Sequence, residues 1–253
     1  MKHTFWLWLS SELSERMLQN LPFIKINPSQ IFLSGGFEEK TINALHQTYP
    51  QAVLWTNLVK QSSFKKLFEN LNVFNKKKIQ YLNDQEHALL RDIDLLWAGP
   101  LKMEANKMPE FFEGAAIQLK TQGLMMFNYL GPDTAKEYWS LLTQVGNIGP
   151  DMHDIGDALI KSGFADPVMN MEYIDLEYET SQLLMKDLYE MGLLSESELV
   201  SDELIRAFDS FKKESPKMKL TLEVVYGHAW KVPKKEPGIT LIPADQILKT
   251  YKK

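Results

Sequence analysis

Residues 31–39 read Ile31-Phe32-Leu33-Ser34-Gly35-Gly36-Phe37-Glu38-Glu39, an apolar run followed by two glycines and two acidic residues. The apolar run predicts a buried β-strand, and the glycines predict a tight turn that leads into a helix. In α/β proteins such a turn lets the backbone approach a nucleotide-like ligand, and the helix N-terminus offers free N–H groups. The stretch therefore predicts an α/β fold with a cofactor site beyond one of its strands.

Further apolar segments alternate with stretches of helical periodicity through the first half of the chain. They predict strands at residues 30–33, 52–56, 79–82, 93–97 and 124–129, and helices at residues 10–21, 37–49, 62–74 and 109–119. We expect Gly123 to end the last of these helices. Apolar strands separated by helices are typical of a parallel sheet that is buried on both faces. We therefore expect a doubly wound α/β fold, which binds ligands beyond the carboxyl ends of its strands.

The second half of the chain predicts two more strands and several helices. The pattern indicates helices at residues 134–142, 152–162, 181–191 and 197–213, and strands at residues 168–178 and 219–230. Helices within residues 179–215 precede the last strand and would form a small helical cap over the open end of the sheet. We expect a single domain over residues 1–253, with the core sheet and its helices in residues 10–150.

The composition favours a globular protein without affinity for nucleic acid or a membrane. Of the 253 residues, 44% are apolar and 24% are charged, and the formal net charge is −5. The chain has no cysteine, which fits a cytoplasmic location, and neither a cysteine nor an H-x-x-x-H pattern supports a metal site. The apolar residues 5–9 are too few to span a bilayer. We expect them to form the first turn of a helix that packs on the body, with membrane contact as the alternative.

Four segments of the second half carry a resemblance to a known family. They are LGPDT at residues 130–134, MHDIGD at 152–157, SGFADP at 162–167 and EVVYGHAWK at 223–231. With residues 14–28, they resemble the malonyl-acyl-carrier-protein O-methyltransferases of biotin synthesis, which are class I S-adenosylmethionine (SAM)-dependent methyltransferases. The resemblance implies a Rossmann-like sheet of seven strands, SAM as methyl donor and an acyl-carrier protein as partner. It also implies methyl transfer to the free carboxyl group of a malonyl group.

The same resemblance implies where the methyl donor binds. Gly35 and Gly36 correspond to the glycine loop of the family, and Asn57 stands where the family has an acidic residue that holds the ribose hydroxyls. Asp84, in the run NDQE, corresponds to the aspartate that faces the adenine amine, although it could instead cap the next helix. Trp97 corresponds to the tryptophan of a W-S-N-like segment at the point of transfer.

Several donor-side positions depart from the pattern of the family. Phe37, Glu38 and Glu39 stand at or beside the remaining glycine positions, Asn57 lacks a charge, and residues 98–101 (AGPL) lack the polar groups of the W-S-N-like segment. The N-terminal arm is short and has no tyrosine. These departures favour a noncatalytic relative, a pseudoenzyme with weak or lost SAM-dependent activity that binds a partner or a carrier-linked acyl group. The alternative is an active SAM-dependent carboxyl O-methyltransferase.

Three residues of the resembling segments are candidates for the acceptor side. His153 lies at a predicted helix start and could face the cleft, or it could serve as a cap or core contact. Tyr226 and His228 lie on one face of the last strand by alternation. Alternatively, Tyr226 and His228 have only a structural role in this aromatic-rich strand. The sequence leaves the catalytic residue and the oligomeric state open.

Overall fold

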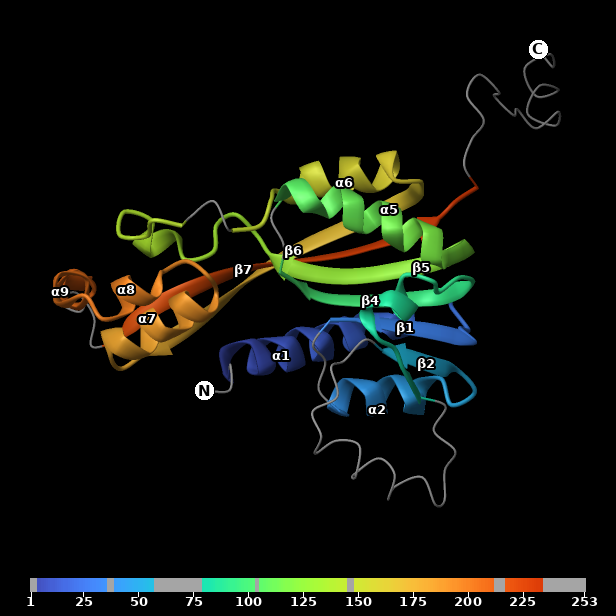
Figure 1. Cartoon of the computed structure of the whole chain (residues 1–253), viewed down its shortest axis with the longest axis horizontal. Helices are drawn as coiled ribbons and strands as arrows, with labels where there is room; N and C mark the ends of the chain where they lie inside the picture. The colour runs from blue at the N-terminus through green and yellow to red at the C-terminus, as the bar shows by residue number, and fades with distance from the viewer. Residues whose placement is uncertain are drawn as a thin grey trace, which may run out of the picture.

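The computed structural model describes residues 4–35, 39–56, 79–102, 105–144, 148–211 and 217–233. These residues form a seven-stranded sheet with the strand order β3-β2-β1-β4-β5-β7-β6 (Figure 1). The strands are β1 (Gln30–Ser34), β2 (Val53–Thr56), β3 (Ile79–Tyr81), β4 (Ile93–Leu101), β5 (Leu119–Leu130), β6 (Phe164–Tyr178) and β7 (Met218–Lys231). Strands β1 to β5 run parallel to one another, whereas β7 runs antiparallel to both β5 and β6. The predicted doubly wound fold of seven strands is confirmed.

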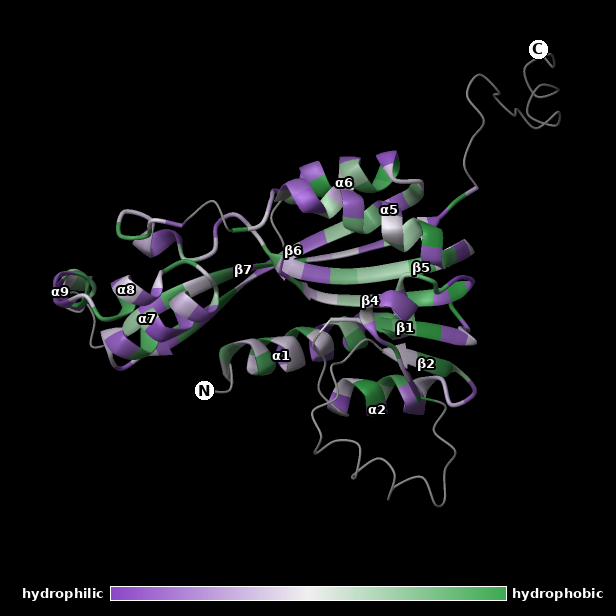
Figure 2. Cartoon of the chain, viewed as in Figure 1, coloured by the Kyte–Doolittle hydropathy of each residue, from purple (hydrophilic) through white to green (hydrophobic). Residues whose placement is uncertain are grey.

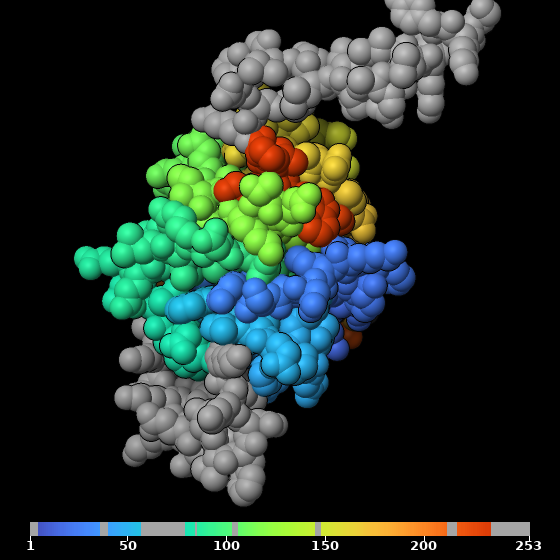
Figure 3. Space-filling view, turned by 90° about the vertical axis from the view of Figure 1, so that its right-hand side faces the viewer, coloured from blue at the N-terminus to red at the C-terminus, as the bar shows by residue number. Residues whose placement is uncertain are grey.

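Helices cover both faces of the sheet. The α-helices are α1 (Thr4–Asn20), α2 (Glu39–Thr48), α4 (Asp84–His87), α5 (Met108–Gln118), α6 (Met152–Lys161), α7 (Ser181–Glu190), α8 (Glu196–Leu199) and α9 (Asp202–Ser210). The short 3-10 helices are η1 (Leu21–Phe23), η2 (Ala105–Lys107) and η3 (Lys136–Tyr138). In Figure 3 the red end of β7 lies between the green of β5 and the yellow of β6 and α6, as the strand order requires.

Alternating residues of the central strands build two separate cores. Leu33 and Trp97 pack with α1 and α2 on one face, whereas Phe32 and Leu96 pack with α5 and α6 on the other. Figure 2 shows the central strands as largely apolar, and the outer residues of the helices as more polar. Apolar side chains on both faces are what a sheet covered on both sides requires.

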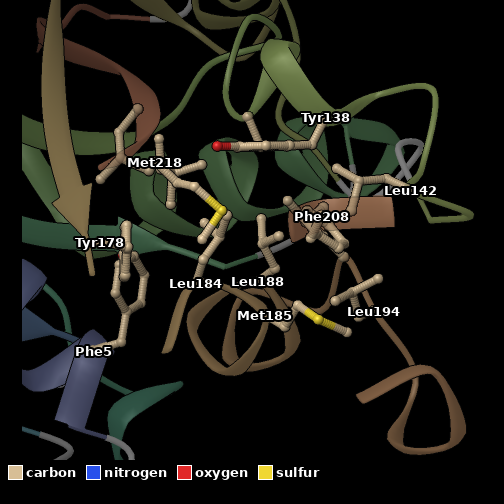
Figure 4. Packing of buried hydrophobic residues seen from close by; sticks show 14 of the residues in the cluster. Phe5, Tyr138, Leu142, Tyr178, Leu184, Met185, Leu188, Leu194, Phe208 and Met218 are labelled. Atoms are coloured by element: carbon tan, nitrogen blue, oxygen red, sulfur yellow. The ribbon is translucent and has the colours of Figure 1, made fainter. Parts of the chain in front are cut away.

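Strands β6 and β7 continue beyond the rest of the sheet as a two-stranded ribbon that carries α7, α8 and α9 (Figure 1). A third core fills the space between the ribbon and these helices (Figure 4). Phe5 of α1 lies beside Tyr178 at the end of β6, and Leu184 and Phe208 come from the helices. We call α7, α8 and α9 the cap.

Two predicted helices of the second half are wrong. In residues 134–142 only η3 forms, because Thr134 and Ala135 bond to β7: the Ala135 N–H donates to the Thr221 carbonyl oxygen (2.8 Å). Residues 197–213 do not form one helix. The Ser195 hydroxyl caps the start of α8, and the Ser201 hydroxyl caps the start of α9, so the chain turns between the two short helices.

The prediction that Gly123 ends the helix before β5 is also wrong. That helix, α5, ends at Gln118, and Gly123 lies inside β5, which begins at Leu119. The pairing of β4 with β5 is irregular there, and a Cβ on Gly123 would lie 2.9 Å from the Ile93 carbonyl oxygen. Glycine therefore permits a close approach of two strands at this point. The helix predicted at residues 62–74 lies outside the described residues.

Candidate functional site

A cavity of about 440 Å³ lies beyond the carboxyl ends of β4 and β5. Its walls include Leu101 at the end of β4 and Lys102 directly after it, Leu130 at the end of β5, Trp6 of α1 and Glu190 of α7. The cavity thus lies between the sheet and the cap, at the edge where doubly wound folds bind ligands. Its volume is within the range of about 300–1,000 Å³ that is typical of small-molecule sites.

The first turn of α1 forms one wall of the cavity because it is attached to the end of α7. The Phe5 N–H donates to a Glu190 carboxylate oxygen (3.1 Å), and the Trp6 indole N–H donates to the Glu190 carbonyl oxygen (2.6 Å). Phe5 and Leu9 are buried, so residues 5–9 pack on the body as predicted. Within the described residues no helix is long and apolar enough to cross a membrane.

Lys102 places a positive charge at this cavity. Its Nζ atom lies 3.7 Å from the centre of a Trp6 ring, which is the geometry of a cation–π contact. Desolvation of the ammonium group lowers the pKa of Lys102 to about 8, and the nearby Glu190 carboxylate opposes that shift. Lys102 was not predicted as a site residue. A lysine after a strand has no distinctive sequence pattern, and only the fold brings Trp6 and Glu190 beside it.

At the predicted donor site, Gly35 adopts a backbone conformation that favours glycine. Its φ is +133°, and a Cβ there would lie 3.1 Å from the carbonyl oxygen of Gly99, which lies in the buried part of β4 near the end of the strand. The ends of β1 and β4 are therefore close, and Gly35 presents bare backbone beyond β1. Gly36 and Asn57 lie outside the described residues.

Asp84 is the first residue of α4, one position after the cap of that helix. The cap is Asn83, whose side-chain oxygen accepts from the N–H groups of Gln85 (3.0 Å) and Glu86 (2.9 Å). Glu86 accepts in turn from the Asn83 N–H (2.9 Å), which completes a capping box. Asn83 therefore occupies the cap position of α4, and because the Asp84 side chain lies outside the described residues, the role of Asp84 stays a prediction.

Trp97 lies fully buried in the core between the sheet and α1. Its indole N–H has no hydrogen-bond partner among the described residues, and the same is true of the side-chain oxygen of Asn128 on β5. The Asn128 side-chain N–H donates to the sulfur of Met17 (2.7 Å), and a Cβ on Gly99 would lie 2.8 Å from the Asn128 side chain. These unsatisfied polar atoms lie near the ends of β4 and β5, where Gly35 and Gly99 leave the backbone uncovered by side chains. A polar ligand bound there could supply the missing hydrogen bonds. Asn128 was missed, although a lone polar residue in the run LMMFNY is a visible signal.

His153 lies at the surface at the start of α6. Its side chain is 81% exposed, and its Nδ1 atom lies 2.7 Å from an oxygen of Asp151, which caps the helix. These hydrogen bonds hold the pKa of the Asp151 carboxyl below its usual range. His153 is not among the residues that line the cavity.

Tyr226 and His228 lie on the face of β7 that is directed toward α1. The Tyr226 hydroxyl donates to Glu172 (2.7 Å), and Arg16 donates to the other oxygen of Glu172 (2.7 Å), so the network ties α1 to β6 and β7. His228 pairs in register with Met126, before the end of β5, and desolvation lowers its pKa. Neither residue lines the cavity.

Two of the segments that carry the resemblance pack directly on one another. The Gly131 N–H donates to the Glu223 carbonyl oxygen (2.8 Å), and the Asp133 N–H donates to the Glu223 carboxylate (2.6 Å). A Cβ on Gly131 would lie 2.5 Å from the Glu223 side chain. LGPDT and EVVYGHAWK therefore form one interlocked structural unit.

Comparisons with known proteins agree with this fold. The chain is 33% identical to the malonyl-[acyl-carrier protein] O-methyltransferase of Gallionella capsiferriformans (strain ES-2), over 88% of this chain and 84% of that protein. Among solved structures, YcgJ of Bacillus subtilis has a TM-score of 0.58 at 11% identity, over 88% of this chain and 99% of that one. Phosphoethanolamine N-methyltransferase 2 of Haemonchus contortus, in complex with SAM, has a TM-score of 0.50 at 13% identity, over 88% of this chain and 53% of that one. No family model matches the chain.

Proposed function

This chain belongs to the malonyl-[acyl-carrier protein] O-methyltransferase family, and from that premise we propose that it binds a malonyl-type acid, linked to an acyl-carrier protein, in the cavity between the sheet and the cap. The observation that supports this proposal is the position of the cavity, at the carboxyl ends of β4 and β5 and beside Lys102. A cationic side chain there suits an acceptor whose reacting group is a carboxylate.

We propose further that the donor side binds SAM weakly, so that the chain acts chiefly by binding the acceptor. Gly35, Gly36, Asn57, Asp84 and Trp97 are the residues that would hold SAM, which supplies an electrophilic methyl group to a carboxylate oxygen. Gly35 fits this role because its bare backbone permits close approach.

Other features of the donor side weaken it. Glu38 and Glu39 follow the predicted glycine turn after one intervening residue, Phe37, and charges at these positions would repel the carboxylate of SAM. Asn57 offers a ribose hydroxyl a neutral hydrogen bond in place of a charge-assisted one. Trp97 is fully buried in an apolar core, so its ring has no exposed surface for a ligand to contact.

An active carboxyl O-methyltransferase is the second candidate function. The observation that favours it is the set of unsatisfied buried polar atoms on Trp97 and Asn128 beside Gly99, because a bound polar ligand would satisfy them. In that case the contribution of the chain is to orient the acceptor carboxylate and to exclude water from the transfer point.

Calorimetry and thermal unfolding with SAM and its demethylated product separate the two candidates. A ligand present at 100 times its dissociation constant raises the free energy of unfolding by about 2.7 kcal/mol. Weak SAM binding predicts no shift at micromolar SAM and no methyl ester on malonyl-carrier protein. A large shift together with methyl ester formation would establish the active enzyme. If the chain fails to bind malonyl-carrier protein at all, the acceptor proposal is wrong.

A further inference from the structure

We propose that Lys102 makes the cavity selective for an acceptor with a free carboxylate over the methyl ester of the same acceptor. The inference rests on the proposed function only in taking the cavity as the acceptor site. It extends that function by naming the residue that distinguishes substrate from product. It applies equally to an active enzyme and to a noncatalytic binding protein.

The first argument is that within the described residues the Lys102 ammonium group makes no ion pair, although the Glu190 carboxylate lies near enough to act on its charge. An ammonium group carries three N–H donors, yet no ion pair or hydrogen bond of Lys102 occurs in the part of the chain that the structure describes. Its defined contact is with the face of Trp6, which fixes its position without supplying a negative charge. The group is therefore placed to receive an acceptor oxygen.

The second argument is that, among the described residues that line the cavity, Glu190 and Lys107 are the other charged ones. The Glu190 carboxylate accepts the Phe5 N–H, so one of its oxygens is already engaged in holding α1. Lys107 comes from η2 and adds a second positive charge to the same wall. The Glu190 carboxylate therefore has a structural role in holding α1, whereas the Lys102 ammonium group donates no hydrogen bond to the described residues and has donors for an acceptor anion.

The third argument is the apolar character of the remaining walls. Leu101, Leu130, Ile148 and Leu193 line the cavity and offer no hydrogen bond from their side chains. A thioester-linked chain can pack against them, but a carboxylate needs a partner when it leaves water. Lys102 supplies that partner to the acid, whereas the neutral ester can accept a hydrogen bond from the ammonium group but lacks the attraction between opposite charges.

The selectivity has a direct consequence for turnover. Methylation of the carboxylate removes the negative charge that Lys102 binds, so an ester formed in the cavity is held less tightly than the acid was. In an active enzyme this difference favours release of the product. In a noncatalytic relative the same difference means that the protein binds the free acid more tightly than the methyl ester.

Calorimetry on the full-length protein without SAM tests the inference, with malonyl-pantetheine and its methyl ester as probes. We expect the wild type to bind the acid about tenfold more tightly than the ester, since a charge-assisted hydrogen bond is stronger by roughly a factor of ten in affinity. Lys102→Met should lose the preference while keeping its affinity for the ester, which shows that the variant is folded. Lys102→Arg should keep the preference, and so should the matched control Lys161→Met, which changes an exposed lysine on α6.

Three results would overturn the inference: equal binding of acid and ester by the wild type, no binding of either, or a preference that survives in Lys102→Met. None of them depends on SAM, so failure of methyl transfer leaves this test intact. The preference should also fall between pH 7 and 9, because Lys102 loses its proton with a pKa of about 8 when the cavity is empty. The malonyl carboxylate stays ionised throughout that range.

Discussion

The two ends of the sheet differ in how tightly their residues constrain one another. Strands β6 and β7 pair from Phe164 opposite Lys231 to Tyr178 opposite Met218, whereas β2 and β3 pair only from Leu54 to Thr56. At the β5–β7 side, backbone and side-chain hydrogen bonds join LGPDT to EVVYGHAWK. At the β1–β2 side, an apolar core is accompanied by hydrogen bonds near the start of β1, where the Ser29 and Gln30 N–H groups donate to the Asp94 carboxylate.

This difference explains why the family is recognisable in the second half of the chain. The segments that carry the resemblance are those in which glycines and buried hydrogen bonds leave no room for other residues, as at Gly131 beneath Glu223. The residues at such positions are determined by the packing of the fold and carry no information about the reaction. Residues that would contact the donor, such as Gly35, can change with less cost to the fold. The resemblance therefore identifies the family more firmly than it identifies the activity.

The largest effect is expected from Gly227→Ala in the middle of β7. A Cβ at this position would overlap the ring of Phe127, which is itself fully buried between α5 and the sheet. Overpacking of this kind costs about 3 kcal/mol, at the upper end of the usual range. Urea denaturation should show the loss as a lower midpoint.

Gly156→Ala in α6 is the matched control. A Cβ there meets no atom within 4 Å, and alanine is a better helix former than glycine, so we expect stabilisation of about 0.5–1 kcal/mol. If both variants have the same stability as the wild type, packing at Gly227 does not constrain the sequence and the comparison fails.

The next effect is expected at Glu223, where LGPDT meets β7. Glu223→Ala leaves the Asp133 N–H without its acceptor, which costs about 2 kcal/mol. Glu223→Gln keeps an acceptor oxygen and should cost less at neutral pH. Thermal unfolding of the two variants side by side separates the hydrogen bond from the charge.

The pH dependence of these variants has a defined sign. Desolvation raises the pKa of Glu223 in the folded state, so the folded protein binds more protons than the unfolded chain as this group titrates. Its contribution to stability is therefore fully present at pH values below the unfolded pKa and is lost as the pH rises through the folded pKa. Glu223→Gln should abolish that contribution. The difference in stability between the wild type and Glu223→Gln isolates this group, and a wild type that gains stability relative to the variant as the pH rises through this titration would contradict the assignment.

Much of the fold could be predicted from the sequence because strand and helix periodicity is local. The strands of the parallel half are found within a few residues of their predicted places, as for β1 (Gln30–Ser34). The helix expected at residues 134–142 fails because Thr134 and Ala135 bond to β7, which lies far along the chain. Local propensity carries no information about such a partner.

The site was harder to predict than the fold for the same reason. Trp6, Lys102 and Glu190 are far apart in the sequence, and none belongs to a motif, yet they meet at the cavity. His153 was selected from a motif and proves to lie at the surface. The segments with the strongest sequence signal hold the sheet together, whereas the cavity is assembled from residues without one.

Gly35→Ala tests the donor side with a moderate expected loss. Its φ of +133° is unfavourable for alanine, and the new Cβ would press on the Gly99 carbonyl oxygen, so we expect a loss of about 1–2 kcal/mol. Any affinity for SAM should fall as well. Gly163→Ala is the control, because its φ of +92° is also unfavourable but its Cβ meets no atom within 4 Å. Equal SAM affinity in the wild type and in Gly35→Ala would remove Gly35 from the donor site.

The smallest effect on global stability is expected from Glu190→Ala, at the wall of the cavity. The variant removes the acceptor of the Phe5 N–H but keeps the backbone carbonyl oxygen that accepts the Trp6 indole N–H. Since only the first turn of α1 depends on this carboxylate, we expect a cost below about 1 kcal/mol. Hydrogen exchange should nevertheless speed up at the start of α1 and leave β5 and β7 unchanged. Glu177→Ala, which removes an exposed partner of Lys217, should leave exchange in α1 as it is. A uniform increase in exchange across the sheet would mean that the first turn of α1 is coupled to β5 and β7. In that case the cavity would be as tightly constrained as the β5–β7 side of the sheet, and the comparison would not extend to it.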